Sequence, residues 1–188
     1  MNFLDIVKKR QSIRHYLCDK PVPRQAIEQC LNAARLAPSA CNSQPWHFII
    51  VDEPGLKKEL GEKIFSGAYG MNSFAKAAPV IVVVVSEKVS FMTKIGGYFR
   101  GTSFYLMDVG IAVEHFILQA AELGLGTCWI GWFNEKEAKK ILNVPRNRKI
   151  DCVFPLGYSE EPLREKNRKP QEEIASFNEY NSKQWPIA

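Results

Sequence analysis

The sequence predicts an α+β fold, with helices around one sheet of four or five strands. Segments with the three-to-four-residue apolar spacing of helices alternate with short runs that are rich in β-branched residues. The chain has 188 residues, the length of one domain, and its 46% hydrophobic and 24% charged residues are ordinary for a packed soluble domain. Neither a repeat nor an internal linker is recognisable, so we expect a single core.

Apolar spacing predicts the helices, which are expected over residues 2–9, 24–36, 54–65, 108–123 and 134–142. The second of these stops at Ala37, because a residue that precedes proline avoids the α region. The helix over 108–123 is apolar nearly all round, which is typical of a helix buried in the core or between subunits.

Four strands are expected, over residues 46–51, 79–85, 127–133 and 151–158. The second is β-branched throughout and apolar on both faces, so it belongs in a sheet that is covered on both sides. Pro155 in the last strand suggests an edge position or a bulge, because proline cannot donate to a strand ladder.

Several classes of protein are disfavoured. No apolar run reaches about 18 residues, which argues against a transmembrane helix, and the N-terminus does not resemble a secretory signal. The five cysteines form no CxxC pair and the three histidines no metal-binding pattern, so no metal site is expected. We therefore expect a cytoplasmic protein.

The net charge of +5 is concentrated in two segments. Residues 1–35 hold seven basic and three acidic side chains, and residues 136–169 hold ten and five. If the fold joins these segments, they form a pocket for an anion such as a phosphate; otherwise the charge is scattered over the surface. Nucleic acid is not expected as a partner, because neither segment contains a dense Lys/Arg run or a known binding motif.

The first candidate site is the sequence from Arg10 to Arg14. In an extended segment Arg10, Ser12 and Arg14 point to the same side, and two guanidinium groups beside a hydroxyl suit a phosphate. The alternative is a pair of solvated arginines after a helix.

The second candidate is the polar loop between Pro38 and Trp46. Its side chains supply donors and acceptors that suit the edge of a planar heterocycle, such as a pyrimidine or a flavin. An ordinary helix-to-strand loop would use the same residue types.

The third candidate is the glycine-containing sequence 124–132, where Trp129 or Ile130 would be able to press against a flat ring. A helix end followed by a core strand explains the same pattern. Neither a nucleophile elbow nor a Walker loop is present, so any chemistry is expected to belong to a cofactor and no side chain is assigned a catalytic role.

Together, four segments resemble the FMN-dependent nitroreductase family. They are RQSIR at 10–14, APSACNSQPW at 37–46, AAELGLGTCWIG at 120–131, and LGY at 156–158 with RKP at 168–170. They occur in the order typical of that family and span nearly the whole chain.

The resemblance implies a three-layer domain over residues 1–170, with a mixed, mostly antiparallel sheet. It also implies a homodimer with FMN at the subunit interface, in which helix 108–123 is the central dimer helix. The aromatic-spotted tail, residues 171–188, would be an arm laid over the partner subunit, although disorder is the alternative.

The resemblance also implies site residues. Arg10, Ser12 and Arg14 would hold the FMN phosphate and ribityl chain together with Arg168, for which Lys166 or Lys169 are alternatives. The flavin ring would be lined from one subunit by Pro38, Ser39, Asn42 and Gln44, and would be approached by Trp129, Ile130 and Gly131.

The implied activity is a ping-pong oxidoreduction. NADH or NADPH would reduce the flavin and leave, after which a nitroaromatic, quinone or similar acceptor would take the electrons from the same face. Phe91, Tyr98 and Phe99, in the glycine-containing segment 90–103, are our candidates for the wall of the acceptor pocket. The alternatives are unusual flavin chemistry on the same fold, such as reductive dehalogenation, and a non-enzymatic flavin-binding dimer.

Overall fold

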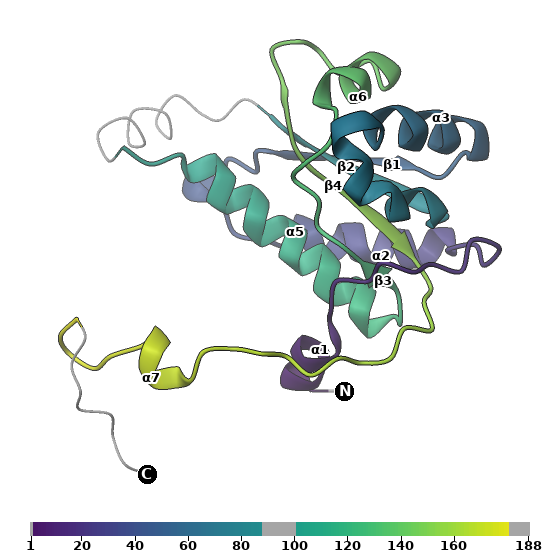
Figure 1. Cartoon of the computed structure of the whole chain (residues 1–188). Coiled ribbons are helices and arrows are strands. Elements are labelled where there is room, and N and C mark those ends of the chain that lie inside the picture. The colour runs from purple at the N-terminus through teal and green to yellow at the C-terminus, as the bar shows by residue number, and fades with distance from the viewer. Residues whose placement is uncertain (1, 88–100, 181–188) are drawn as a thin grey trace.

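The computed structural model describes residues 2–87 and 101–180, and within them the fold has three layers (Figure 1). The sheet has four strands in the order β1-β2-β4-β3, and every neighbouring pair is antiparallel. The strands are β1 (Trp46–Val51), β2 (Val80–Ser86), β3 (Gly126–Thr127) and β4 (Lys149–Gly157). The α+β fold class with a mostly antiparallel sheet is confirmed.

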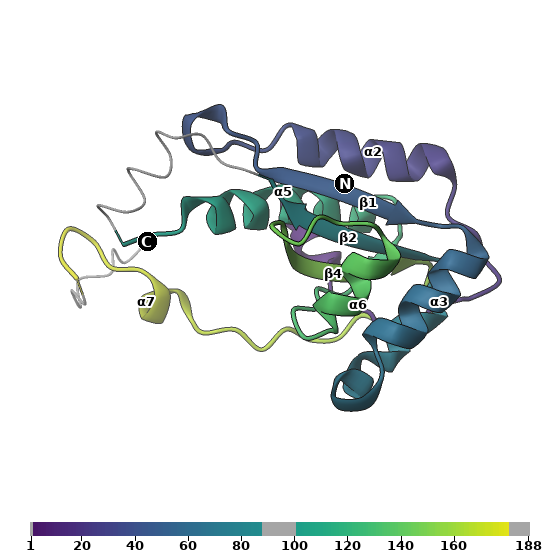
Figure 2. The same cartoon turned by 90° about the horizontal axis from the view of Figure 1, so that it is seen from above.

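Helices cover both faces of this sheet (Figure 2). On one face lie α2 (Arg24–Arg35) and α5 (Phe104–Glu122). On the other lie α3 (Pro54–Ile64), the 3₁₀ segment η2 (Gly67–Ala77) and α6 (Glu135–Ile141). The remaining helices are α1 (Phe3–Lys9), η1 (Ala40–Asn42) and α7 (Gln171–Ile174).

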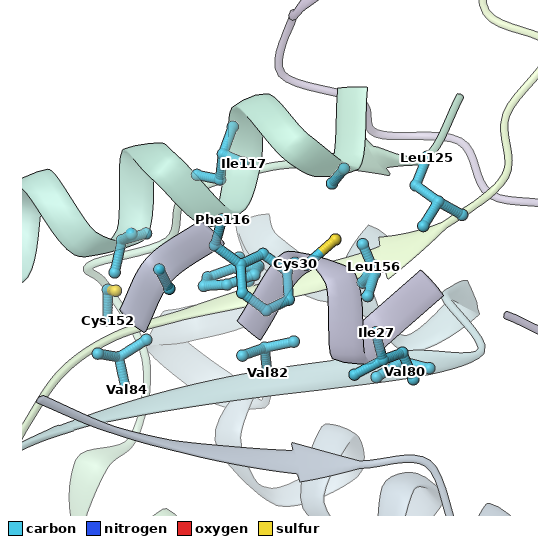
Figure 3. Close-up of a cluster of buried hydrophobic side chains, with 14 of the residues drawn as sticks. Ile27, Cys30, Val80, Val82, Val84, Phe116, Ile117, Leu125, Cys152 and Leu156 are labelled. Carbon is cyan, nitrogen blue, oxygen red and sulfur yellow. The ribbon is translucent and has the colours of Figure 1, made fainter. Parts of the chain in front are cut away.

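Strand β2 is buried along its whole length. Val80, Val82 and Val84 enter the core beneath α2 and α5 (Figure 3), whereas the alternate residues enter the core beneath α3 and α6. A strand covered on both faces has no need of polar positions, which explains its unbroken apolar sequence from Val80 to Val85.

Helix α5 begins four residues earlier than expected. By length and composition alone it is long and apolar enough to cross a membrane, which the search for an unbroken apolar run did not indicate. Its buried residues, among them Val109 and Val113, form one face that packs against the sheet. Figure 3 shows Phe116 and Ile117 of this face above the strands. The helix is therefore a core helix, while Met107 and Ile111 on its other side are exposed.

The prediction of a strand over residues 127–133 is wrong beyond Thr127, where β3 ends. In the described part of the chain beyond β3, only Ile130 pairs with β4, where it exchanges backbone hydrogen bonds of 2.9 and 3.0 Å with Val153. Residues two apart on a strand point their backbone nitrogens to the same side, so Pro155 faces the gap between the Thr127 and Ile130 pairings. Having no N–H, Pro155 cannot extend the ladder there.

The expectation that Pro155 marks an edge strand or a bulge is also wrong. Strand β4 lies inside the sheet between β2 and β3, and its register irregularity falls opposite Val84 and Val85. Proline is tolerated at this inner position because its nitrogen faces the interrupted side of the strand.

Residues after α1 run extended beside β3, an arrangement that positions the site described below. Ser12 pairs in parallel with Thr127, and the Ile13 N–H donates to the Thr127 carbonyl at 2.9 Å. A Cβ on Gly126 would lie 2.7 Å from the Ile13 side chain. The close approach of the two backbones therefore requires glycine at position 126.

Two expectations fall outside the described residues. Phe91, Tyr98 and Phe99 lie within residues 88–100, and the end of the tail lies within residues 181–188. The part of the tail that is described, residues 171–180, is exposed throughout.

Candidate functional site

The chain from Ser159 to Arg168 is fastened along the extended segment 10–15. A Glu161 carboxylate oxygen accepts the backbone N–H groups of Arg14 at 2.6 Å and His15 at 2.7 Å. Gln11 donates to the Pro162 carbonyl and accepts from the Arg164 N–H, both at 3.0 Å. Two segments about 150 residues apart in sequence are thus held side by side.

This pairing gathers five cations, which we call the N-terminal basic cluster: Arg10, Arg14, Arg164, Lys166 and Arg168. Arg164 donates to Glu161 and, at 3.3 Å, to the Ser12 carbonyl. The Lys166 ammonium donates to the carbonyls of Val7, at 3.0 Å, and Lys8, at the end of α1. Arg10 and Arg168, which the sequence analysis assigned to one phosphate, both lie close enough to Lys166 for their charges to act on it.

Positive charge in this cluster is not fully balanced. Burial and the charges of Arg10 and Arg168 lower the pKa of Lys166. The Arg10 Nε is buried without a hydrogen-bond partner among the described residues, and Arg10 lines a cavity of about 160 Å³. A dianion such as a phosphate would relieve both the repulsion and the unsatisfied donor.

Ser12 and Arg14 also adjoin Cys128, which the sequence analysis did not single out as a site residue. Burial raises the pKa of the Cys128 thiol, whereas Arg14 and a hydrogen bond with the Ser12 side chain partly offset that effect. The Arg14 guanidinium in turn lies 5.9 Å from the centre of the Phe74 ring. Because Cys128 follows Thr127, the pairing of β3 with segment 10–14 brings it there.

The polar loop 38–44 is an ordered structure. The Gln44 N–H donates to the Ser39 hydroxyl at 3.0 Å, and the Gln44 amide donates to the Asn42 side chain at 3.0 Å. Cys41, Asn42 and Gln44 all have positive φ values, which are uncommon for residues other than glycine. Pro38, Asn42 and Gln44 are exposed, so the loop presents polar groups outward.

A buried carboxylate anchors this loop to α5. Asp108 accepts the Ala40 N–H at 3.0 Å, and its second oxygen has no partner among the described residues. Sequence reasoning missed Asp108. The available signal was an acidic residue among the apolar residues of the first half of the helix.

The structure does not bring the loop 38–44 and the N-terminal basic cluster together within one chain. The loop is tied to Asp108 near the start of α5, whereas the cluster lies by Gly124 and Gly126 beyond its end (Figure 1). The sixteen residues from Asp108 to Gly124 correspond to about 24 Å of helix.

The three residues expected beside the flavin ring, Trp129, Ile130 and Gly131, differ in their exposure to solvent. Ile130 is only 3% exposed, and both of its backbone groups are bonded to Val153. Trp129, at 44% exposed, and the exposed Gly131 face outward on either side of it. Ile130 thus fixes the chain while its two neighbours are available to a ligand.

Beyond Gly131, Trp132 forms an aromatic surface that the sequence analysis did not predict. Its indole N–H donates to the Ala68 carbonyl at 3.2 Å, and its ring centre lies 5.3 Å from that of Tyr69. The Asn72 amide donates to the Trp132 carbonyl at 2.8 Å. The contacts come from η2, which carried no signal in the periodicity of the sequence.

Comparison with known proteins identifies the fold. The model of the Nitroreductase family matches residues 7–158. A putative NADH dehydrogenase/NAD(P)H nitroreductase of Methanothermobacter thermautotrophicus is 34% identical, over 86% of this chain and 79% of that protein. An iodotyrosine deiodinase of Thermotoga neapolitana is 28% identical, over 90% and 94% of the two chains.

A solved structure agrees with these relatives. An FMN-dependent nitroreductase from Clostridium difficile superposes with a TM-score of 0.74 at 29% identity, covering 94% of this chain and 99% of that one. The matched region contains the extended segment 10–14, the loop 38–44 and the sequence 124–131. The chain belongs to the nitroreductase family.

Proposed function

We propose that this protein is an FMN-dependent oxidoreductase that uses NADH or NADPH to reduce a nitroaromatic, quinone or similar acceptor. The observation that carries the proposal is the unbalanced positive charge around Arg10, Lys166 and Arg168. Relatives named NAD(P)H nitroreductase, and a solved relative named FMN-dependent, support the same activity.

The residues present suit the phosphate of FMN. Arg10, Lys166 and Arg168 would neutralise its charge, and the buried Arg10 Nε would gain an acceptor. Ser12 and Arg14 would bind the ribityl chain from the same side of the extended segment. Glu161 would keep that segment straight through its bonds to Arg14 and His15.

A second copy of the chain would complete the site. The loop 38–44 lies too far along α5 to join the N-terminal basic cluster of its own chain, so its polar groups would line the ring of the partner's flavin. Exposed apolar side chains also mark a surface that a second copy would cover: Phe3 and Leu4 on α1, Leu106, Met107 and Ile111 on α5, and Ile174 in the tail. A homodimer with the tail as an arm would cover these side chains.

Bound FMN would supply the redox chemistry by accepting two electrons from the nicotinamide and passing them to the acceptor. The protein would bind and orient the groups around it. Trp129 would pack against the ring system, and Gly131 would leave the adjoining surface open, because nothing lies within 4 Å of where its Cβ would be. No protein side chain is assigned a proton-transfer role, and a cytoplasmic location fits the use of free nicotinamides.

Reductive dehalogenation is a second candidate. The iodotyrosine deiodinase of Thermotoga neapolitana matches nine-tenths of the chain, and dehalogenation would use the same flavin site with another acceptor. Halide release from a halogenated phenol, in place of nitroaromatic or quinone reduction, would favour it.

The visible spectrum of the purified protein, recorded without oxygen, tests the proposal. We expect flavin bands that bleach with NADH or NADPH and return on addition of a nitroaromatic or quinone. Bands that no nicotinamide bleaches would contradict the proposed donor. A protein that takes up no FMN would contradict the proposed cofactor.

A further inference from the structure

A second positively charged region remains outside the proposed flavin site. Six of the ten basic residues in segment 136–169 lie between positions 136 and 149, on α6 and the chain that leads into β4. They do not join the N-terminal basic cluster, which takes only side chains from 164–168 of that segment. At about 3.3 Å per residue, β4 separates Lys149 from Gly157 by about 26 Å.

Acidic residues balance only half of these six cations. Glu135 binds Lys139 at 2.8 Å and also Lys149, and Glu87 binds Arg148 at 2.7 Å. In the described part of the chain, Lys136, Lys140 and Arg146 have no acidic partner within salt-bridge distance.

The three unpaired cations line one open cavity of about 870 Å³, together with Val144 and Pro145. Lys136 and Lys140 are four residues apart on α6 and therefore share a face. A neighbouring cavity of about 350 Å³ shares Glu135 and Lys136 with the first and reaches Gly131 and Trp132. We call the two together the α6 trough.

Trp132, at the other end of the trough, is exposed yet fixed. Its side chain is 58% exposed, although Ala68, Asn72 and Tyr69 hold its indole and backbone. A ring that is already immobilised loses little conformational entropy when a flat base stacks on it. One end of the trough is thus suited to a base and the other to phosphates.

We propose that the α6 trough binds the adenosine-phosphate half of the nicotinamide dinucleotide and gives the protein a preference for NADPH over NADH. This inference rests on the proposed function, in which Gly131 leaves the surface beside the flavin ring open, and the nicotinamide would enter there. The 2′-phosphate of NADPH adds a dianion that NADH lacks, and Arg146 can bind such a group with two parallel hydrogen bonds.

The trough stays accessible in the dimer proposed above. The exposed apolar side chains assigned to that interface lie on α1, α5 and the tail, whereas α6 lies at the opposite side of the sheet from α1 (Figure 1). The trough, which reaches Gly131, would therefore remain open to a dinucleotide in that dimer.

The test compares Lys140→Ala with Arg146→Ala, as a double variant, against the matched double variant Lys58→Ala with Lys63→Ala on α3. Both pairs remove two exposed lysine or arginine charges. Titration calorimetry of the FMN-loaded protein would measure its affinity for adenosine 2′,5′-bisphosphate and for adenosine 5′-monophosphate. We expect the trough variant to bind the bisphosphate at least about tenfold more weakly, with a smaller loss for the monophosphate, and the control to match the wild type.

Rates of flavin bleaching with each nicotinamide complete the test. The ratio of kcat/KM for NADPH to that for NADH should fall about tenfold in the trough variant. Trp132→Ala should lower kcat/KM for both donors. Equal use of NADPH and NADH by the wild type, or unchanged bisphosphate binding in the trough variant, would overturn this inference and leave the proposed function standing. Failure of both nicotinamides to bleach the wild type would instead overturn the proposed function.

Discussion

The two basic regions of this protein are organised by one glutamate each, but in different ways. Glu161, whose side chain is 11% exposed, binds the backbone N–H groups of Arg14 and His15. Glu135 instead binds the flexible side chains of Lys139 and Lys149, together with the Ile150 N–H. Glu161 mainly fixes a main chain that carries cations, although it also pairs with Arg164, whereas Glu135 mainly neutralises two of the cations around it.

Because of this difference, the two basic regions suit different kinds of ligand. Fixing the backbone preorganises Arg10, Ser12 and Arg14 without consuming their charge, which suits a small anion held tightly. Glu135 pairs with two lysines and Glu87 with Arg148, which leaves Lys136, Lys140 and Arg146 without an acidic partner among the described residues. Three unpaired cations along an open trough suit an exchangeable ligand. Substitutions in the two regions should therefore differ in the size of their effect and in the property that they affect.

The largest effect is expected from removing the cations of the N-terminal basic cluster. Arg10→Ala with Arg14→Ala should release FMN on gel filtration while the protein stays folded, because two charge-assisted bonds are lost. At about 1.5–3 kcal/mol for each bond, FMN affinity should fall more than a hundredfold. Lys136→Ala with Lys140→Ala removes the same charge and should retain the flavin; full retention in the arginine variant would contradict the phosphate assignment.

A smaller effect is expected from Glu161→Gln. Hydrogen bonds from Arg14, His15 and Arg164 outweigh the effect of burial and lower the pKa of Glu161. The carboxylate therefore stabilises the fold fully above its unfolded pKa of about 4.5, and this contribution is lost as the pH falls through the lower folded value. The variant should lose about 2 kcal/mol at pH 7, and its disadvantage should shrink in acid.

Urea unfolding at pH 7 and in the acid range below pH 4.5 would measure this difference. FMN affinity measured beside it should fall about tenfold, because the extended segment loses its alignment. A variant with wild-type flavin affinity would show that the segment keeps its shape without the charge of Glu161.

The smallest effect is expected from Glu135→Gln. Burial alone would raise the pKa of Glu135, but bonds from Lys139, Lys149 and the Ile150 N–H lower it overall. Partly exposed ion pairs contribute up to about 1 kcal/mol, so the Tm at pH 7 should fall by only about 2–4 °C. FMN content should not change, and loss of flavin here would contradict the separation of the two regions.

Local pattern was sufficient to predict most elements. The spacing of Ile27, Cys30 and Ala34 predicts α2, and the β-branched run from Val80 predicts a strand covered on both sides. These signals are reliable because burial of one face, or of both, requires apolar residues at fixed spacings within a short stretch of sequence. The strand expected to 133 is interrupted directly after Thr127, because the residue opposite Cys128 is Pro155, which lies on another strand and has no N–H to donate.

The candidate site was only half predictable. The sequence pointed to Arg10, Ser12, Arg14 and the polar loop, because residue type and spacing reveal the chemistry a segment offers. It did not reveal Asp108, Cys128 or Trp132 as site residues, whose importance comes from contacts with distant segments.

The sequence by itself determined the α+β class and the positions of the main helices, and it pointed to the phosphate-binding role proposed for segment 10–14, since these depend on neighbouring residues. Tertiary structure decided which cations share that segment and which do not. Lys166 reaches it because Glu161 and Gln11 fasten residues 159–166 along it, whereas Lys140 and Arg146 are carried to the other end of β4. Charge is a property of residues, but its concentration at one point depends on contacts between segments far apart in the chain.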